Sequence, residues 1–331
     1  MTNKLAISLA CGPYDRTRAI LDGRVGIEGC EVAASGLEPE EMFFRAYRYQ
    51  DFDVTELSLS THMLTTARGD SPFVGVPAFL SRLFRHSGIY IRSDRGIKAP
   101  ADLKGKTIGL PEYQQTANVW IRGMLSDEYG VKASDIRWRS GGLEQPGRTE
   151  RTPIKLPPEI DCKPIASDAT LSQLLERGEL DGVIGPRAPS CFTRGTANIA
   201  RLFPDYRRAE EEYFRKTRLF PIMHIVGIRK ALAERHPWLP ANVYAAFVKA
   251  KELGVADLNQ LGRLSVSLPW AVSELHRTKD LMGEDYWSYG VTRNRPEIEA
   301  VTRYLVEQGL ASRRLTPEEI FAPSTLEGTK V

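Results

Sequence analysis

The sequence predicts an α/β protein made of two lobes. Over its 331 residues, short apolar stretches with β-like alternation recur between helical stretches, which is the pattern of largely parallel sheets. A chain of this length suits two domains. Two segments, near residues 86–92 and 219–228, lead from one predicted unit to the other. We therefore expect a discontinuous first lobe (1–91 and 225–331), a second lobe (92–224), a hinge and an interlobe cleft.

The first lobe is predicted from apolar periodicity interrupted by Gly and Pro. Its strands are expected at residues 5–9, 30–33, 53–59 and 73–79, and its first helices at 17–22, 39–49 and 62–68. Ligands of parallel sheets bind beyond the carboxyl ends of the strands. The polar residues at the ends of the first and third strands form the expected pocket rim: Tyr14, Asp15, Arg16, Glu56, Ser58, Ser60 and His62.

The core of the second lobe is predicted to begin with a strand at 107–110 and a helix at 117–129. The polar loop between them carries Gln114 and Thr116, and the start of a helix offers free N–H groups to a carboxylate. The later elements are a long excursion (141–158), a helix (171–177) and a strand (180–184) that precedes Arg187. Helices at 240–253, 257–264, 270–276 and 295–308 are expected to complete the first lobe, and their apolar content motivates the hypothesis of a homo-oligomer.

Composition excludes several classes of protein. The net charge is only +3 and the basic residues are scattered, so no nucleic-acid partner is expected. The four cysteines are widely spaced, which indicates neither a zinc site nor a disulfide scaffold. The sequence has no apolar run of about 18 residues, so no membrane span is expected. The first apolar run is too short for a signal sequence, which predicts a cytoplasmic protein.

Two arginines and a histidine lie within five residues: Arg82, Arg85 and His86. A guanidinium group presents a rigid fork of donors that matches a carboxylate, and an imidazole titrates near neutrality. The cluster therefore favours a pocket for a polyanionic substrate with acid–base chemistry. The alternative is a solvated basic turn with a partly buried histidine.

Longer strings carry a resemblance to a known family. PADLKGKTIGLPEYQQT (100–116) resembles the beginning of the second lobe in type II periplasmic-binding-protein folds. Five strings resemble the 4,5-dihydroxyphthalate decarboxylase family: ELSLS (56–60), SRLFRHSGIYIR (81–92), EYQQTANVWIRGML (112–125), FPIMHIV (220–226) and MGEDYWSYG (282–290). The resemblance implies a type II periplasmic-binding-protein-like fold with the active site in the interlobe cleft.

The same resemblance implies a reaction, the loss of one carboxylate from 4,5-dihydroxyphthalate to give protocatechuate and CO2 in phthalate catabolism. Each carboxylate is para to a hydroxyl, so the phenolate pushes electron density onto the carbon that bears the carboxylate. Protonation there gives a cyclohexadienone, and CO2 leaves as the ring becomes aromatic again. The phenol is the electron sink, so no organic cofactor is expected. The enzyme needs carboxylate clamps, a base for the phenol and an acid for the ring carbon.

Candidate residues for these tasks follow from the resemblance and from residue type. His86 or His224 is the expected acid, with Glu56 or His62 as the base. The expected clamps are Arg82, Arg85 and Arg187, helped by Gln114 and Thr116. Stacking or hydrogen bonding to the ring is expected from Tyr14, Tyr113 and Trp287.

Three alternatives stay open. A divalent metal could be bound jointly by Glu56, His62, His86 and His224. Their spacing matches no compact ligand motif, so the metal-free alternative is favoured. The protein could be a non-catalytic binding protein for an aromatic carboxylate, because fold does not fix function. It could also decarboxylate a related hydroxylated aromatic acid. In every case the expected partner is a small aromatic carboxylate.

Overall fold

The computed structural model of the chain describes residues 4–260 and 262–327, and packing divides them into two compact units. Unit 1 runs to Arg82, resumes over Ile222–Ile298 and continues from Leu315, whereas unit 2 comprises Leu83–Pro221 and Glu299–Arg314. The first division therefore falls before the expected boundary at residue 91. The return of the chain to unit 2 over Glu299–Arg314 was not expected from the sequence.

Unit 1 is built on a five-stranded sheet with the order β2-β1-β3-β11-β4. The strands are β1 (Leu5–Cys11), β2 (Cys30–Gly36), β3 (Val54–Ser58), β4 (Phe73–Arg82) and β11 (Ile222–Arg229). β1 pairs in parallel with β2 and β3, and β11 runs antiparallel between β3 and β4. Every residue of β3 is buried, as expected for a central strand with both faces covered. The carboxyl ends of β1 and β3 and the amino end of β11 thus share one edge of the sheet.

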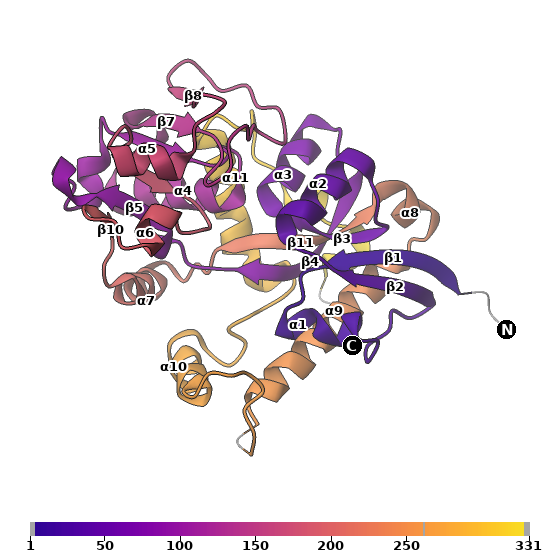
Figure 1. Cartoon of the computed structure of the whole chain (residues 1–331). Helices are drawn as coiled ribbons and strands as arrows, with labels where there is room; N and C mark the ends of the chain where they lie inside the picture. The colour runs from indigo at the N-terminus through magenta and orange to yellow at the C-terminus, as the bar shows by residue number, and fades with distance from the viewer. Residues whose placement is uncertain (1–3, 261, 328–331) are drawn as a thin grey trace. The chain divides into compact units, whose positions relative to one another are not determined.

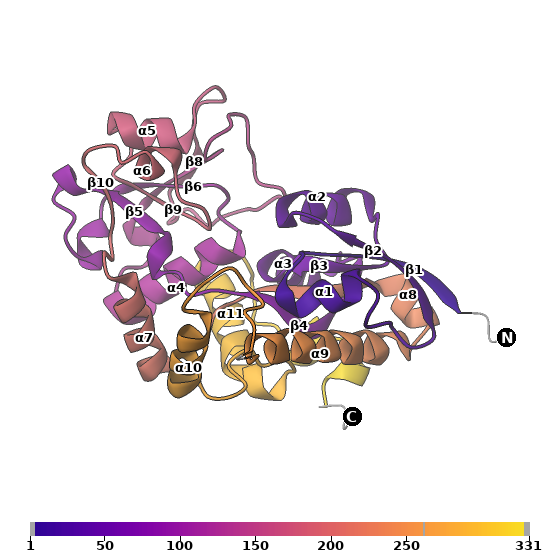
Figure 2. The ribbon, with the colours of Figure 1, turned by 60° about the horizontal axis from the view of Figure 1, so that its bottom comes forward.

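Helices cover both faces of this sheet, as Figures 1 and 2 show. α2 (Pro39–Tyr49) and α3 (Leu59–Arg68) lie on one face, while α1 (Asp15–Leu21) and α9 (Leu239–Leu258) pack together on the other. Right-handed crossovers explain this, because the chain moves outward from β1 to β2 and then back across β1 to β3. The remaining elements are α8 (Lys230–Arg235), α10 (Ala271–Met282), α12 (Pro317–Ile320), η5 (Thr292–Asn294) and η6 (Pro323–Thr325).

The expectation of separate helices at 240–253 and 257–264 is wrong, since α9 is continuous to Leu258. Gly254 does not break it, and the missing Cβ lets the backbone of Asp15 approach closely. The helix ends where the N–H of Asn259 bonds to the carbonyls of Val255 and Ala256. Residue 261 lies outside the described residues, and residues 262–264 are not helical.

Unit 2 contains a six-stranded sheet with the order β10-β5-β9-β6-β7-β8. The strands are β5 (Ile89–Arg92), β6 (Thr107–Leu110), β7 (Arg137–Ser140), β8 (Cys162–Pro164), β9 (Gly182–Ile184) and β10 (Ile199–Arg201). β6, β7, β8 and β9 are parallel, and β5 and β10 add antiparallel strands at one edge. Because β5 belongs to this sheet, the chain has already entered unit 2 before residue 89.

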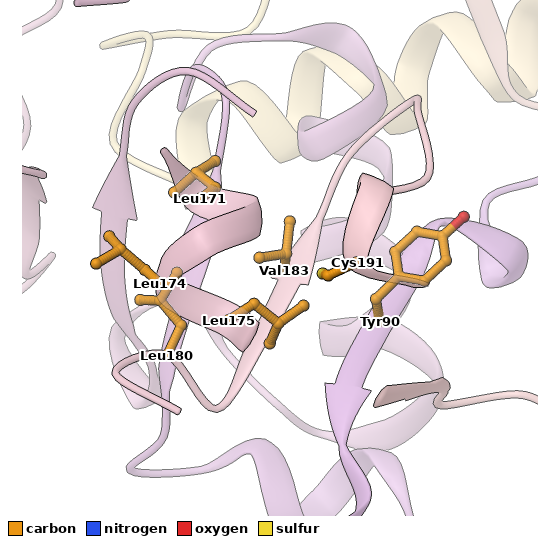
Figure 3. Packing of buried hydrophobic residues seen from close by; sticks show 7 residues of the cluster. All are labelled: Tyr90, Leu171, Leu174, Leu175, Leu180, Val183 and Cys191. Atoms are coloured by element: carbon orange, nitrogen blue, oxygen red, sulfur yellow. The ribbon is translucent and has the colours of Figure 1, made fainter. Parts of the chain in front are cut away.

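The core of unit 2 packs helices against this sheet. The elements are α4 (Thr116–Tyr129), α5 (Leu171–Arg177), α6 (Ser190–Thr193), α7 (Tyr206–Thr217), η1 (His86–Gly88), η2 (Ser93–Arg95), η3 (Pro100–Leu103) and η4 (Ala133–Asp135). Figure 3 shows one buried cluster, in which leucines of α5 meet strand and α6 side chains: Tyr90, Leu171, Leu174, Leu175, Leu180, Val183 and Cys191. Burial of such apolar surface is the main force that stabilises the unit.

α11 (Arg295–Glu307) begins in unit 1 and continues in unit 2 from Glu299. Its Tyr304 ring packs edge-on against Trp120 of α4 at 5.6 Å, and the Tyr304 hydroxyl donates to Asp127 at 2.6 Å. These contacts explain why residues 299–314 belong to unit 2.

The described residues contain no helix that is long and apolar enough to cross a bilayer. The four cysteines are unpaired, and Cys11, Cys30 and Cys191 are buried.

Candidate active site

Glu56 is the centre of a hydrogen-bonded group in unit 1. Its side chain projects from β3 and is completely buried. The Oε1 atom lies 2.6 Å from Nδ1 of His224 and accepts a hydrogen bond from the Tyr14 hydroxyl at 3.0 Å. The Oε2 atom accepts from the backbone N–H of Gly12 at 2.8 Å. Both carboxylate oxygens are thus held by groups from β11 and from the loop between β1 and α1.

His224 lies near the beginning of β11 and contributes its side chain to this group. The pairing of β11 with β4 is irregular on both sides of His224, which re-aims its side chain. A carboxylate only accepts hydrogen bonds, so Nδ1 carries the proton toward Glu56 and Nε2 is left for another partner. The side chain is 18% exposed, and its Nε2 makes no hydrogen bond within residues 4–260 and 262–327. Phe43 lies edge-on to the imidazole at 4.8 Å.

Tyr14 and Gly12 are positioned by the turn that joins β1 to α1. A Cβ at residue 12 would overlap the Tyr14 ring, so glycine is needed for the ring to reach Glu56. The Thr17 hydroxyl accepts the N–H of Tyr14 at 3.0 Å and fixes the start of α1. Burial and the charge of Glu56 raise the pKa of the Tyr14 hydroxyl, which therefore stays a hydrogen-bond donor at neutral pH. Burial likewise raises the pKa of the Cys11 thiol, so this cysteine is not a thiolate nucleophile.

Arg16 contacts two aromatic rings beside this group. Its Cζ lies 4.3 Å from the ring centroid of Tyr14 and 4.1 Å from that of Trp287. The Nε atom donates to the carbonyl of Leu80 at 2.6 Å, and Nη1 lies 3.0 Å from a carboxylate oxygen of Asp15. The indole N–H of Trp287 donates to the carbonyl of Phe79 at 2.9 Å, which fixes the second ring.

The structure does not form the expected pair between His62 and Glu56. His62 lies on α3, and its Nε2 is 3.0 Å from the carbonyl oxygen of Ile320. Its side chain is buried, and burial lowers the pKa of His62 to about 4, so the imidazole is neutral at pH 7. The carboxylate of Glu56 is instead occupied by His224, which argues against His62 as the base.

Arg82 is engaged within unit 1. The guanidinium donates to the amide oxygen of Asn294 and lies 3.8 Å from the carboxylate of Glu297. Both charged side chains are buried. Burial lowers the pKa of Arg82 to about 10, which still leaves it charged at neutral pH. These contacts give Arg82 a structural role and argue against the expected substrate clamp.

Arg85 and His86 lie in unit 2, although only two residues separate Arg82 from Arg85 in the chain. Both are buried, and burial lowers the pKa of Arg85 to about 10. The His86 ring lies 5.0 Å from Phe203 and 5.4 Å from Tyr213, and neither ring nitrogen has a hydrogen-bond partner in the described part of the chain. Burial lowers the pKa of His86 to about 4, so it carries no proton to donate as an imidazolium at pH 7.

The loop before α4 is occupied by side chains of unit 2. Glu112 is completely buried and accepts hydrogen bonds from Gln114 at 2.8 Å, Arg148 at 3.0 Å and Arg151 at 2.8 Å. Glu150 accepts the backbone N–H of Tyr113, and burial raises the pKa of Glu150 to about 7. The protein's own carboxylates thus meet the polar groups that were expected to bind the substrate.

The other expected binding residues of unit 2 are found in different environments. Thr116 is the buried first residue of α4. Tyr113 is a core residue, since its hydroxyl donates to the carbonyl of Gln308 and its ring lies 3.8 Å from Cζ of Arg122. Arg187 is exposed in the segment after β9. The described residues contain no cluster of three or more His, Cys, Asp or Glu side chains arranged to hold a metal ion.

Comparison with known proteins identifies the family. A profile described as NMT1/THI5 like matches residues 53–144. A 4,5-dihydroxyphthalate decarboxylase of Comamonas testosteroni is 49% identical over 332 residues, which cover 99% of this chain and 100% of that protein. The chain belongs to the 4,5-dihydroxyphthalate decarboxylase family. A member from Pseudomonas putida is 51% identical over 213 residues, 64% of this chain and 83% of that protein. The resemblance expected from the five sequence strings is therefore confirmed.

This decarboxylase-family chain shares its fold with solute-binding proteins. The periplasmic aliphatic sulphonate binding protein SsuA from Escherichia coli has a TM-score of 0.55 and 14% identity, covering 99% of this chain and 96% of that one. A putative sulfonate-binding SsuA from Methylobacillus flagellatus KT has a TM-score of 0.56 and 14% identity, covering 98% and 93%. The predicted α/β fold of the periplasmic-binding-protein type is confirmed.

Sequence reasoning placed Tyr14, Arg16 and Glu56 on the pocket rim but missed how they combine. It did not anticipate the N–H of Gly12 as a ligand of Glu56, nor the stacking of Arg16 on Trp287. The available signal for the first was the Gly12-Pro13 break directly after a strand. No sequence signal linked Trp287 to Arg16, because 271 positions separate them.

Proposed function

We propose that this protein removes one carboxylate from 4,5-dihydroxyphthalate and releases protocatechuate and CO2. The observation that carries the proposal is the Glu56–His224 pair, in a chain that is 49% identical to a named decarboxylase along its whole length. The pair presents one free imidazole nitrogen beside the aromatic side chains of Tyr14 and Phe43. An aromatic acid that needs a proton on a ring carbon fits this chemistry.

His224 is the residue we assign to proton transfer. The phenol para to the departing carboxylate first gives its proton to solvent. Nε2, after taking up a proton from solvent, delivers that proton to the ring carbon that bears the departing carboxylate, and the phenolate supplies the electrons for the new C–H bond. The C–C bond then breaks, its electron pair returns to the ring, and CO2 leaves. The phenolate oxygen finally regains a proton, so the net reaction consumes one proton and produces one CO2.

Glu56 is the positioning residue in this scheme. Both of its oxygens are occupied and its side chain is inaccessible, so it does not reach the substrate. Its hydrogen bond to Nδ1 fixes the tautomer and the orientation of the imidazole, the role that a carboxylate has beside histidine in hydrolase triads. The proton transfer by His224 that Glu56 supports typically contributes about a hundred- to ten-thousand-fold.

Several expectations remain proposals. Arg85 and Arg187 stay candidates for the substrate's second carboxylate, and the ring's own phenol removes the need for an organic cofactor. The cytoplasmic location, the homo-oligomer and the interlobe position of the active site stay predictions from the sequence. Turnover by chelator-treated protein, with and without an added divalent ion, tests whether the reaction needs a metal.

The test is turnover of 4,5-dihydroxyphthalate by chelator-treated protein, with protocatechuate and CO2 both quantified. In D2O we expect one deuterium at the vacated ring position, because ring-carbon protonation uses a solvent-exchanged proton. Recovery of activity only with an added divalent ion would replace the metal-free scheme. Stoichiometric binding with no product would overturn the decarboxylase and favour the binding-protein alternative.

A further inference from the structure

We propose that Arg16 is the residue that binds a carboxylate of the aromatic substrate. This inference rests on the proposed function, because it takes an aromatic dicarboxylate as the ligand. It assigns the clamp to a residue outside the Arg82–His86 cluster, and the reasons are the rigidity of Arg16, its unused donor and its place beside the proton-transfer pair.

The guanidinium of Arg16 is held in one plane. Tyr14 and Trp287 lie against it at 4.3 and 4.1 Å, measured from Cζ to each ring centroid. The carbonyl of Leu80 accepts from Nε at 2.6 Å and fixes the rotation of the group about its own axis. A guanidinium fixed in this way loses little further freedom when it binds a ligand, which favours affinity.

Arg16 also has hydrogen-bonding capacity to spare. Asp15 engages only Nη1, and Nη2 makes no hydrogen bond within the described residues. The Arg16 side chain is 16% exposed and that of Asp15 is 39% exposed, so solvent-borne ligands can reach this end of the group. Nη2 and the second hydrogen of Nη1 form the two-pronged edge that pairs with a carboxylate.

Tyr14 connects Arg16 to the residues proposed to transfer the proton. The Tyr14 side chain contacts the guanidinium with its ring and Glu56 with its hydroxyl. Tyr14 therefore contacts both Arg16 and the carboxylate of the Glu56–His224 pair. A single-ring substrate can place a carboxylate on Arg16 while a ring carbon faces Nε2 of His224. Holding reactants in such a geometry is a large source of rate enhancement.

Two of the arginines expected to bind the substrate are less suited to holding the retained carboxylate. Arg82 is buried against Asn294 and Glu297, and Arg187 is exposed. Arg16 combines partial exposure with a fixed orientation. The carboxylate that it holds is the one retained in the product, because a tight grip on the departing group would oppose the reaction.

Binding measurements test the assignment without relying on turnover. Calorimetric titrations of the wild type, Arg16→Gln and Arg16→Lys would use phthalate, which has two carboxylates and no hydroxyl, and catechol, which has the hydroxyls alone. Arg18→Gln is the matched control, since Arg18 is an exposed arginine of the same helix. We expect Arg16→Gln to weaken phthalate binding by about tenfold or more and to leave catechol binding unchanged.

Each outcome decides the assignment. Unchanged phthalate binding by a folded Arg16→Gln protein would overturn it, and an equal loss of phthalate and catechol would show a packing role instead. If Arg16→Gln does not fold, Arg16→Lys decides, because lysine keeps the charge but not the planar fork. A wild type that binds neither phthalate nor 4,5-dihydroxyphthalate would refute the proposed function itself. If the wild type turns over the substrate and Arg16→Gln binds phthalate as tightly as the wild type, only the assignment of Arg16 as the carboxylate-binding residue is refuted.

Discussion

Nδ1 of His224 lies 2.6 Å from Oε1 of Glu56, although 168 positions separate the two residues in the chain. Antiparallel pairing of β3 with β11 sets His224 opposite Ser58, two residues beyond Glu56. Residues two apart on a strand point to the same face, so Glu56 and His224 are diagonal neighbours across the two strands. The pair is thus a direct product of strand register, and a slip of one residue would separate it.

Replacement of His224 by Asn should remove the proton donor and leave the fold intact. We expect kcat to fall by about a hundred- to ten-thousand-fold, the usual contribution of a positioned acid–base group. His276→Asn is the control, because His276 is exposed on α10 and should retain wild-type activity. Wild-type kcat in a folded His224→Asn protein would refute the role assigned to this imidazole.

Glu56→Gln keeps the size of the side chain but removes its charge. We expect a lower kcat with little change in KM, because the neutral amide no longer holds the imidazole in the tautomer and orientation that proton transfer needs. The double variant with His224→Asn should be little worse than His224→Asn alone, since the two residues act as a unit. Additive losses would show that Glu56 acts independently of His224.

Arg82→Met should affect stability and leave substrate binding unchanged. The substitution removes the buried guanidinium opposite Glu297, a change that typically lowers the free energy of unfolding by about 3–5 kcal/mol. The exposed pair Arg45–Asp51 provides the control, because Arg45→Met should lower the free energy of unfolding far less than Arg82→Met does. Chemical denaturation gives both values. A stable Arg82→Met protein with a raised KM would restore Arg82 as a substrate clamp.

The loss of folding stability at acidic pH should depend in part on His86. Its pKa is about 4 in the folded chain against an ordinary value near 6.5, so between these pH values the unfolded state binds more protons. Stability contributed by the neutral imidazole is therefore complete above pH 6.5 and is lost as pH falls toward 4, by at most about 1.4 kcal/mol per pH unit.

His86→Phe keeps an aromatic ring beside Phe203 and Tyr213 but cannot titrate. Urea denaturation at a series of pH values should give a shallower decline in stability for this variant than for the wild type. His62 has a similarly lowered pKa and should supply part of the remaining decline. Parallel pH profiles for His86→Phe and the wild type would contradict this account.

Local pattern was enough for much of the fold. The alternation of short strands and helices, with breaks such as Gly12-Pro13, predicted β1, α2, β6 and α5 because these elements depend on nearby residues. The return of residues 299–314 to unit 2 depends on Tyr304 meeting Trp120, a contact that periodicity does not encode.

The sequence by itself determined the α/β class, the family and the residue types that the chemistry needs, because these follow from local patterning and characteristic strings. Tertiary structure alone decided which of these residues meet. It separated Arg82 from Arg85 by placing them in different units, bonded His62 to Ile320, and joined Glu56 to His224. The physical reason is that side-chain partners are chosen by strand register and burial, which arise from long-range packing, whereas proximity along the chain constrains them only weakly.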